Sequence, residues 1–216
     1  SDTLLKKEFL SMFFLFLLLS STAFAMVGTG EQSDVNMNLK YPLVYLDNKE
    51  AQDTINSDIA NYVDNLKDRY YSGNVYQAKM SYNVMYENNQ YLSITIISYW
   101  YWAGAAHGMY TKYGLVYDKN TGARVPVSNF VSIATPEQID NGIRGYVLDL
   151  LSENGNRLYL GSYARVKRIS SDYYLGGNGT IYLIYQPYEL SSFSNGATSV
   201  KFTLQAIDYF NRRNNN

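Results

Sequence analysis

The chain has 216 residues, no cysteine and a formal net charge of −1. The absence of cysteine excludes disulfides, thiol catalysis and cysteine-ligated metals, and the near-neutral charge gives no support for binding to nucleic acid or to anionic lipid. Tyrosine occurs 23 times, which predicts a tyrosine-rich sheet, with a tyrosine-rich binding face as the functional alternative.

Residues 1–25 have the pattern of a secretory signal peptide. Lys6 and Lys7 precede an apolar run over residues 9–19, and the small-residue site Ala23-Phe24-Ala25 follows. The run is shorter than the roughly 20 apolar residues of a bilayer span, although an uncleaved anchor is the alternative. We therefore expect an exported bacterial protein of the periplasm, cell surface or medium, without stable membrane insertion after cleavage.

The next segments are predicted to be a flexible lead-in over residues 26–35, a strand over residues 36–46 and a long helix. Asp47 is the expected N-cap of this helix and Gly73 its stop. Apolar residues recur along the helix at a spacing of three and four: Ile55, Ile59, Tyr62, Val63, Leu66 and Tyr70. Alternation of apolar and polar residues then predicts strands over residues 76–86, 91–102, 110–117 and 123–127.

A second helix is predicted to begin after Thr135, which suits an N-cap, with Pro136 at the first helical position. Its apolar stripe, weakened by Gly142 and Gly145, is expected to reach Leu151. Further strands are expected over residues 173–175, 180–185 and 200–204, followed by a short helix to residue 210.

This order of elements predicts an α+β fold. We expect an antiparallel sheet, built from a meander and hairpins, that packs against two main helices. The sheet and helices are expected to form a single extracytoplasmic domain over residues 36–210. A frayed polar tail is expected over residues 211–216.

No catalytic constellation is visible in the sequence. The chain lacks a Gly-x-Ser-x-Gly elbow, a phosphate-binding loop and a dinucleotide fingerprint. One histidine and no cysteine argue against a zinc site. Paired carboxylates for sugar hydrolysis stay an alternative, because the fold sets their separation. We expect no enzymatic activity, no cofactor and no metal.

The only histidine, His107, lies in the segment SYWYWAGAAHGMYTKYG, residues 98–114, which connects two predicted strands. It could bond to backbone in a tight connection, contribute to recognition at a loop tip, or act as a catalytic base. Because no partner for a base is visible, the first two roles are favoured. The candidate binding residues of this segment are Trp100, Trp102, Gly104, His107, Gly108 and Tyr110.

Two stretches resemble signatures of a known family. YWYWAGAAHGMYTKYGLVYDKNTG, residues 99–122, is similar to a signature written around Gly-Gly-Ala-His-Gly. YYLGGNGTIYLIYQPYEL, residues 173–190, is similar to a second signature that ends in Gln-Pro-Tyr-Glu. The family is a bacterial extracytoplasmic domain of unknown function, found in the lysozyme-sensing anti-sigma-V factor and on the N-terminal side of some peptidoglycan deacetylases. The resemblance spans about residues 36–210.

The resemblance implies a non-catalytic α+β module that faces the cell envelope. It adds Gln186, Tyr188 and Glu189 to the candidate binding residues. It also implies a lysozyme-type muramidase as the leading partner. The alternatives are a module that binds peptidoglycan or another carbohydrate, a carbohydrate-active enzyme, and a purely structural envelope domain.

Overall fold

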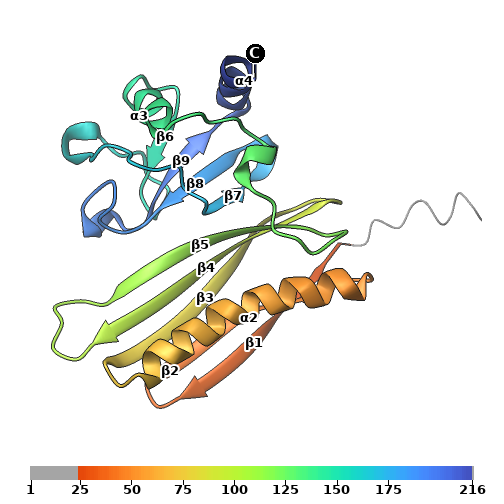
Figure 1. Ribbon diagram of the computed structural model, residues 1–216. Helices are drawn as coiled ribbons and strands as arrows, with labels where there is room; N and C mark the ends of the chain where they lie inside the picture. The colour runs from red at the N-terminus through yellow and green to blue at the C-terminus, as the bar shows by residue number, and fades with distance from the viewer. Residues whose placement is uncertain (1–23, 216) are drawn as a thin grey trace, which may run out of the picture.

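The computed structural model describes residues 24–215, so the predicted signal peptide falls almost wholly outside the described residues (Figure 1). The fold is α+β, as predicted, but it contains two sheets rather than one. No helix in the described part is both long and apolar enough to span a membrane.

The first sheet has five strands in the order β1-β2-β3-β4-β5. Their bounds are β1 (Met26–Asp34), β2 (Met37–Tyr45), β3 (Val75–Glu87), β4 (Tyr91–Trp102) and β5 (Met109–Asp118). Neighbouring strands are antiparallel except β2 and β3, which run parallel. The parallel pair needs a crossover connection, and helix α2 (Lys49–Tyr71) supplies it.

The expectation of a flexible lead-in over residues 26–35 is wrong, because strand β1 occupies nearly all of it. Every residue of β1 pairs with β2, from Met26 opposite Tyr45 to Asp34 opposite Met37. The segment has no alternating apolar pattern. It becomes a strand because β2 offers unpaired backbone groups along its edge.

Helix α2 covers one face of the first sheet (Figure 1). The Asn48 side chain accepts a hydrogen bond from the Ala51 backbone N–H at 3.1 Å, so the N-cap lies one residue after the predicted Asp47. The helix shares its buried core with Ile94 and Ile96 of β4. Its buried side chains are Ala51, Ile55, Ile59, Val63 and Leu66.

The second sheet has four antiparallel strands in the order β6-β9-β8-β7. Their bounds are β6 (Asp149–Leu151), β7 (Tyr173–Leu175), β8 (Ile181–Tyr185) and β9 (Thr198–Phe202). Helices α3 (Pro136–Arg144) and α4 (Leu204–Asn214) share a second buried core with one face of this sheet. The edge strand β7 contacts β3, β4 and β5 of the first sheet.

Helix α3 begins as predicted but ends earlier. Thr135 accepts a hydrogen bond from the Gln138 backbone N–H, and Gly145 is the C-cap. Residues 149–151, expected at the end of this helix, instead form β6 and pair with β9. Leu150 has the spacing of a helix residue, but the edge of β9 offers its backbone a sheet partner.

Two further boundaries differ from the expectation. In place of a strand over residues 123–127, only Arg124 makes a bridge, to Tyr117. In place of a frayed tail from residue 211, helix α4 continues to Asn214. The Asn214 side chain donates to the Ser132 carbonyl at 2.7 Å, which fixes the end of the helix against the rest of the protein.

The two sheets approach each other through backbone. The Leu175 N–H donates to Ser93 Oγ at 2.8 Å, and the Gly114 N–H donates to Asp172 Oδ1 at 3.1 Å. A Cβ at residue 114 would overlap the Tyr173 backbone, so only glycine allows this approach. The second sheet therefore covers part of the face of the first sheet opposite α2 (Figure 1).

Candidate functional site

The two signature stretches meet in space. The His107 ring stacks on Phe193 with centroids 4.0 Å apart, and its Nε2 lies 3.0 Å from the Tyr188 hydroxyl. The Tyr188 ring also stacks on Phe193 at 5.2 Å. We call His107, Tyr188 and Phe193 the aromatic clasp. It joins the β4–β5 connection to the segment between β8 and β9.

Both ring nitrogens of His107 have partners. Nδ1 lies 2.8 Å from the Gly108 carbonyl, which can only accept a hydrogen bond. Nδ1 therefore carries a proton, and in the neutral ring Nε2 accepts from the Tyr188 hydroxyl. This arrangement orients the ring within the clasp, and it gives His107 no carboxylate partner of the kind that a catalytic base uses.

Tyr188 lies at a position where glycine is usual. The Glu189 N–H donates to the Gln186 carbonyl at 3.0 Å, which closes a β-turn with Pro187 and Tyr188 at its centre. Proline followed by a residue with positive φ is the pattern of a type II turn. Tyr188 has φ of 70° and a side chain that is 56 % exposed. An exposed aromatic residue at such a position is strained.

Gln186 and Glu189 hold this turn against the sheets. Gln186 Oε1 accepts from the Lys112 N–H and Nε2 donates to the Lys112 carbonyl, each at 2.9 Å. Arg168 donates two hydrogen bonds of 2.6 Å to the Glu189 carboxylate. Burial tends to raise the pKa of Glu189, but the bonds from Arg168 and from the Gln186 N–H outweigh it, so this pKa is lowered.

Tyr110 connects β5 to the start of β9. Its hydroxyl donates to Glu153 Oε2, and the Ala197 N–H donates to the Tyr110 hydroxyl at 2.7 Å and to Glu153 Oε2 at 3.1 Å. Burial, together with the bond to Glu153, raises the pKa of Tyr110 well above its usual range. Tyr110 is thus a neutral hydrogen-bonding group within a link between the sheets.

Trp100, Trp102 and Gly104 do not join the clasp. Trp100 lies under the guanidinium of Arg69, 4.2 Å from its carbon, and contacts Trp102 edge-on with centroids 6.0 Å apart. Both tryptophans are on the α2 side of the sheet. Among the described residues the buried Trp100 Nε1 has no hydrogen-bond partner. Gly104 has φ of +81° and no neighbour that a Cβ would meet.

A cleft of about 420 Å³ lies where the second sheet meets β5. One face of the second sheet forms the floor of this cleft. A row of cross-strand neighbours lies along it: Asp149, Lys201, Tyr182 and Tyr174. The side chain of Lys112, on β5, lies next to the end of this row, 5.9 Å from the Tyr174 ring centroid. The strand pattern predicted both tyrosines, but nothing local indicated that Lys112 and Glu153 would face them.

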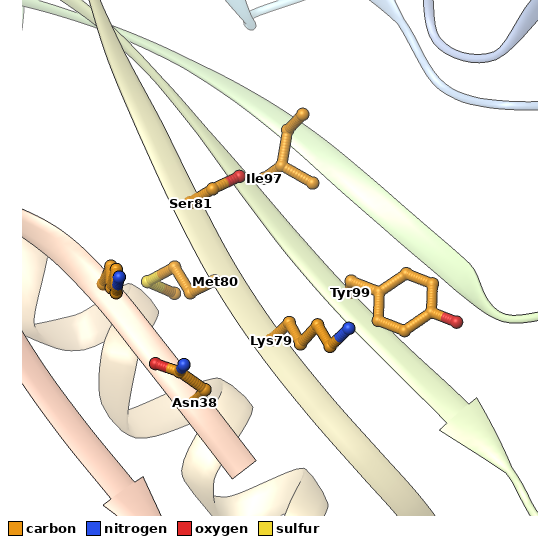
Figure 2. Close-up of a pocket in the computed structure, with 7 residues that line it drawn as sticks. Asn38, Lys79, Met80, Ser81, Ile97 and Tyr99 are labelled. Atoms are coloured by element: carbon orange, nitrogen blue, oxygen red, sulfur yellow. The ribbon is translucent and has the colours of Figure 1, made fainter. Parts of the chain in front are cut away.

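A second, open depression of about 380 Å³ lies on the uncovered face of the first sheet. Figure 2 shows Lys79 and Tyr99 side by side along its border, with Asn38 on the opposite side. Tyr99 also lies over Gly108, where any Cβ would overlap its ring. This contact gives Gly108 a steric role next to the clasp.

Within residues 24–215 the side chains form no group of three or more histidine, cysteine, aspartate or glutamate residues that could hold a metal ion. What the arrangement offers is an exposed aromatic clasp at one end and a polar cleft lined by lysine, tyrosine and carboxylate side chains.

The comparisons with known proteins agree with the resemblance predicted from the sequence. Residues 29–110 match the family model described as deacetylase PdaC. This match includes most of β1, all of β2, β3 and β4, and His107. A search of curated proteins gave no match.

Two solved structures have a similar fold. A DUF3298 family member from Bacteroides fragilis is 12 % identical with a TM-score of 0.56, and the alignment covers 87 % of this chain and 92 % of that one. A DUF3298 family protein from Pseudomonas aeruginosa is 10 % identical with a TM-score of 0.51, covering 86 % and 91 %. At these identities the likeness shows a shared fold. Together with the family-model match, this likeness is consistent with a domain of unknown function that is associated with deacetylases.

Proposed function

We propose that this protein is a non-catalytic binding module of the bacterial cell envelope, with a lysozyme-type muramidase as its leading partner. The observation that carries the proposal is the aromatic clasp. Two segments far apart in the sequence build it, and it keeps a half-exposed tyrosine in a strained backbone conformation.

The clasp has the properties of an interface anchor. Aromatic residues supply most of the binding energy in many protein interfaces, chiefly where they are rigid before binding. His107 and Tyr188 are both exposed, and stacking on Phe193 restricts both. The choice of a muramidase as partner rests on the family resemblance, and the export on which it depends rests on the N-terminal pattern.

The non-catalytic part of the proposal rests on how the polar groups are used. His107 bonds to Tyr188 and to backbone, while Glu153 bonds to Tyr110 and Ala197. Neither group is left free for proton transfer in the way that a general base requires.

The test is a titration of the purified protein with hen egg-white lysozyme, together with an assay of muramidase inhibition. Tyr188→Ala is expected to weaken binding by about tenfold or more, the usual effect of truncating an aromatic anchor. Tyr159→Ala is the matched control, because Tyr159 is 94 % exposed and lies outside the clasp. Circular dichroism of each variant verifies folding.

Two results would overturn the proposal in different ways. Absence of binding by the wild-type protein would exclude lysozyme as the partner. Equal affinities of the wild type and Tyr188→Ala would exclude the clasp as the contact surface.

A further inference from the structure

The cleft between the sheets contains an ammonium group without a hydrogen-bond acceptor. The Lys112 side chain is only 15 % exposed, and its nearest charged partner is Glu153 Oε1, 4.0 Å away. That distance exceeds a hydrogen bond. Within residues 24–215 Lys112 Nζ donates no hydrogen bond, and the bonds of Lys112 to Gln186 come from its backbone. Burial lowers the pKa of Lys112, although the charge of Glu153 partly opposes this.

Partial burial makes it less favourable to keep this group charged. A largely desolvated charge is tolerated where an opposite charge or several acceptors compensate it. Here the other carboxylate oxygen of Glu153 already accepts from Tyr110 and Ala197. The ammonium end of Lys112 faces the cleft instead, so an acceptor entering from solvent would satisfy it.

The backbone of Lys112 is held on both sides. It pairs with β4 through Ile97 and with the Gln186 side chain through two bonds of 2.9 Å. The ammonium group is therefore positioned before any ligand arrives, and a preorganised group binds with a smaller entropic cost.

A second cation lies at the other end of the tyrosine pair. The Tyr174 and Tyr182 rings stack in parallel, 4.6 Å apart, with Lys112 beside the first and Lys201 beside the second at 5.8 Å. Asp149, the next residue in the row, is paired with Arg157 at 3.4 Å. The floor thus presents two ammonium groups with a pair of stacked phenol rings between them.

The size and lining of the cleft restrict the ligand further. Its volume is at the lower end of the range for small-molecule sites. The hydroxyls of Ser152 and Ser199 line it beside the tyrosines, and Leu151 and Met85 add small apolar surfaces. A ligand of this size that has many hydroxyls, a partly apolar body and a negative group matches this lining.

We propose that the cleft binds an acidic saccharide, whose carboxylate or phosphate group accepts hydrogen bonds from Lys112. This site is separate from the aromatic clasp, and its ligand is a small sugar rather than a protein. It extends the proposed function without depending on muramidase binding.

The experiment measures binding by calorimetry for four probes. N-acetylmuramic acid carries a carboxylate, N-acetylglucosamine 6-phosphate carries a phosphate, N-acetylglucosamine is neutral, and inorganic phosphate has no sugar. We expect one or both acidic sugars to bind about tenfold or more tightly than the neutral sugar. The acidic sugar that binds more tightly identifies the source of the anionic group.

The variant Lys112→Met tests the assigned contact, because it keeps an unbranched side chain as far as Cε and removes the charged ammonium group. It is expected to weaken binding of the acidic sugar by about tenfold. Lys167→Met is the matched control, since Lys167 is exposed and does not line the cleft. Lys112→Gln provides a polar alternative if the methionine variant does not fold.

Three outcomes would overturn this proposal. Equal binding of neutral and acidic sugars would exclude an anion site, and unchanged affinity in a folded Lys112 variant would exclude the assigned residue. Phosphate binding as tight as that of the sugar phosphate would exclude a saccharide site. Because these ligands differ from lysozyme, failure here and failure of the proposed function are distinguishable.

Discussion

The Gln186 side chain pairs with the backbone of Lys112 as a neighbouring strand would. It accepts from the N–H and donates to the carbonyl, each at 2.9 Å, so one side chain satisfies two backbone groups on the edge of β5. The second signature stretch is thereby attached to β5, a strand that lies within the first stretch.

Gln186→Leu is expected to lower the free energy of unfolding by about 2 kcal/mol, because it leaves two partly buried backbone groups without partners. Chemical denaturation monitored by circular dichroism measures this change. Gln205→Leu is the control, since Gln205 is exposed on α4 and its replacement is expected to change stability by less than about 0.5 kcal/mol. Similar effects of the two substitutions would contradict the role of the Gln186 amide.

Gly108→Ala is expected to destabilise the protein by about 1–2 kcal/mol, because the new methyl group overlaps the Tyr99 ring. The cost should largely disappear in a Tyr99→Ala background, where the space is empty. A double-mutant cycle of unfolding free energies measures this coupling. Gly161→Ala, at a site with no neighbour within reach of a Cβ, is the control. Additive effects of the two substitutions would exclude the steric explanation.

The backbone of Tyr188 predicts an unusual order of stabilities. Tyr188→Gly and Tyr188→Ala both remove the ring, but only glycine adopts φ of 70° without strain. The glycine variant is therefore expected to be about 1 kcal/mol more stable than the alanine variant. At Tyr159, with φ of −80°, the order should be the usual one, with alanine more stable. Thermal or chemical unfolding of the four variants measures the two orders. The same order at both positions would contradict the assigned strain at Tyr188.

Glu189 predicts a loss of stability in acid. Its pKa is lowered because Arg168 and the Gln186 N–H bind the carboxylate more strongly than burial opposes its charge. A lowered pKa means that the ionised form stabilises the folded state above the ordinary value of 4.5, and that this contribution disappears as the pH falls through the lowered pKa.

Glu189→Gln is expected to make unfolding less dependent on pH between about pH 5 and 2. The wild type and variant should differ at pH 7 by about 1 kcal/mol or less, because solvent partly screens Arg168. Asp208→Gln is the control for removing an exposed carboxylate, since the Asp208 side chain is 58 % exposed. Parallel pH profiles of the wild type and Glu189→Gln would contradict this account.

The regular elements were predictable where one face of an element is buried. Strand β4 has the predicted bounds, Tyr91 to Trp102, because large apolar residues recur at its even-numbered positions: Leu92, Ile94, Ile96, Trp100 and Trp102. Strand β1 lacks such a pattern, and only its pairing with β2 makes it a strand. The spacing of apolar residues up to Leu150 suits both a helix and a short strand. The predicted end of α3 was therefore wrong.

The clasp was only partly visible in the sequence. The signature stretches contain His107 and Tyr188, but Phe193 lies beyond them in a single 3-10 turn, Phe193–Asn195, which is too short to show periodicity. The strand register could have placed Tyr110 and Trp100 on opposite sides of the sheet. Tyr110 pairs with Tyr99, whereas Trp100 pairs with Met109, and neighbouring pairs point to opposite sides. Contacts such as that of Lys112 with Glu153 have no local signal, since they arise from the packing of two sheets.

The close approach at Gly114 has a consequence for the divergence of this fold. A side chain at this position would push the backbone of Tyr173 away, whichever ligand the protein binds. Residues that line the cleft can change as ligands change, whereas residue 114 is fixed by the geometry of the chain itself. A glycine at this point of β5 is therefore expected to persist among distant relatives whose binding residues have been replaced.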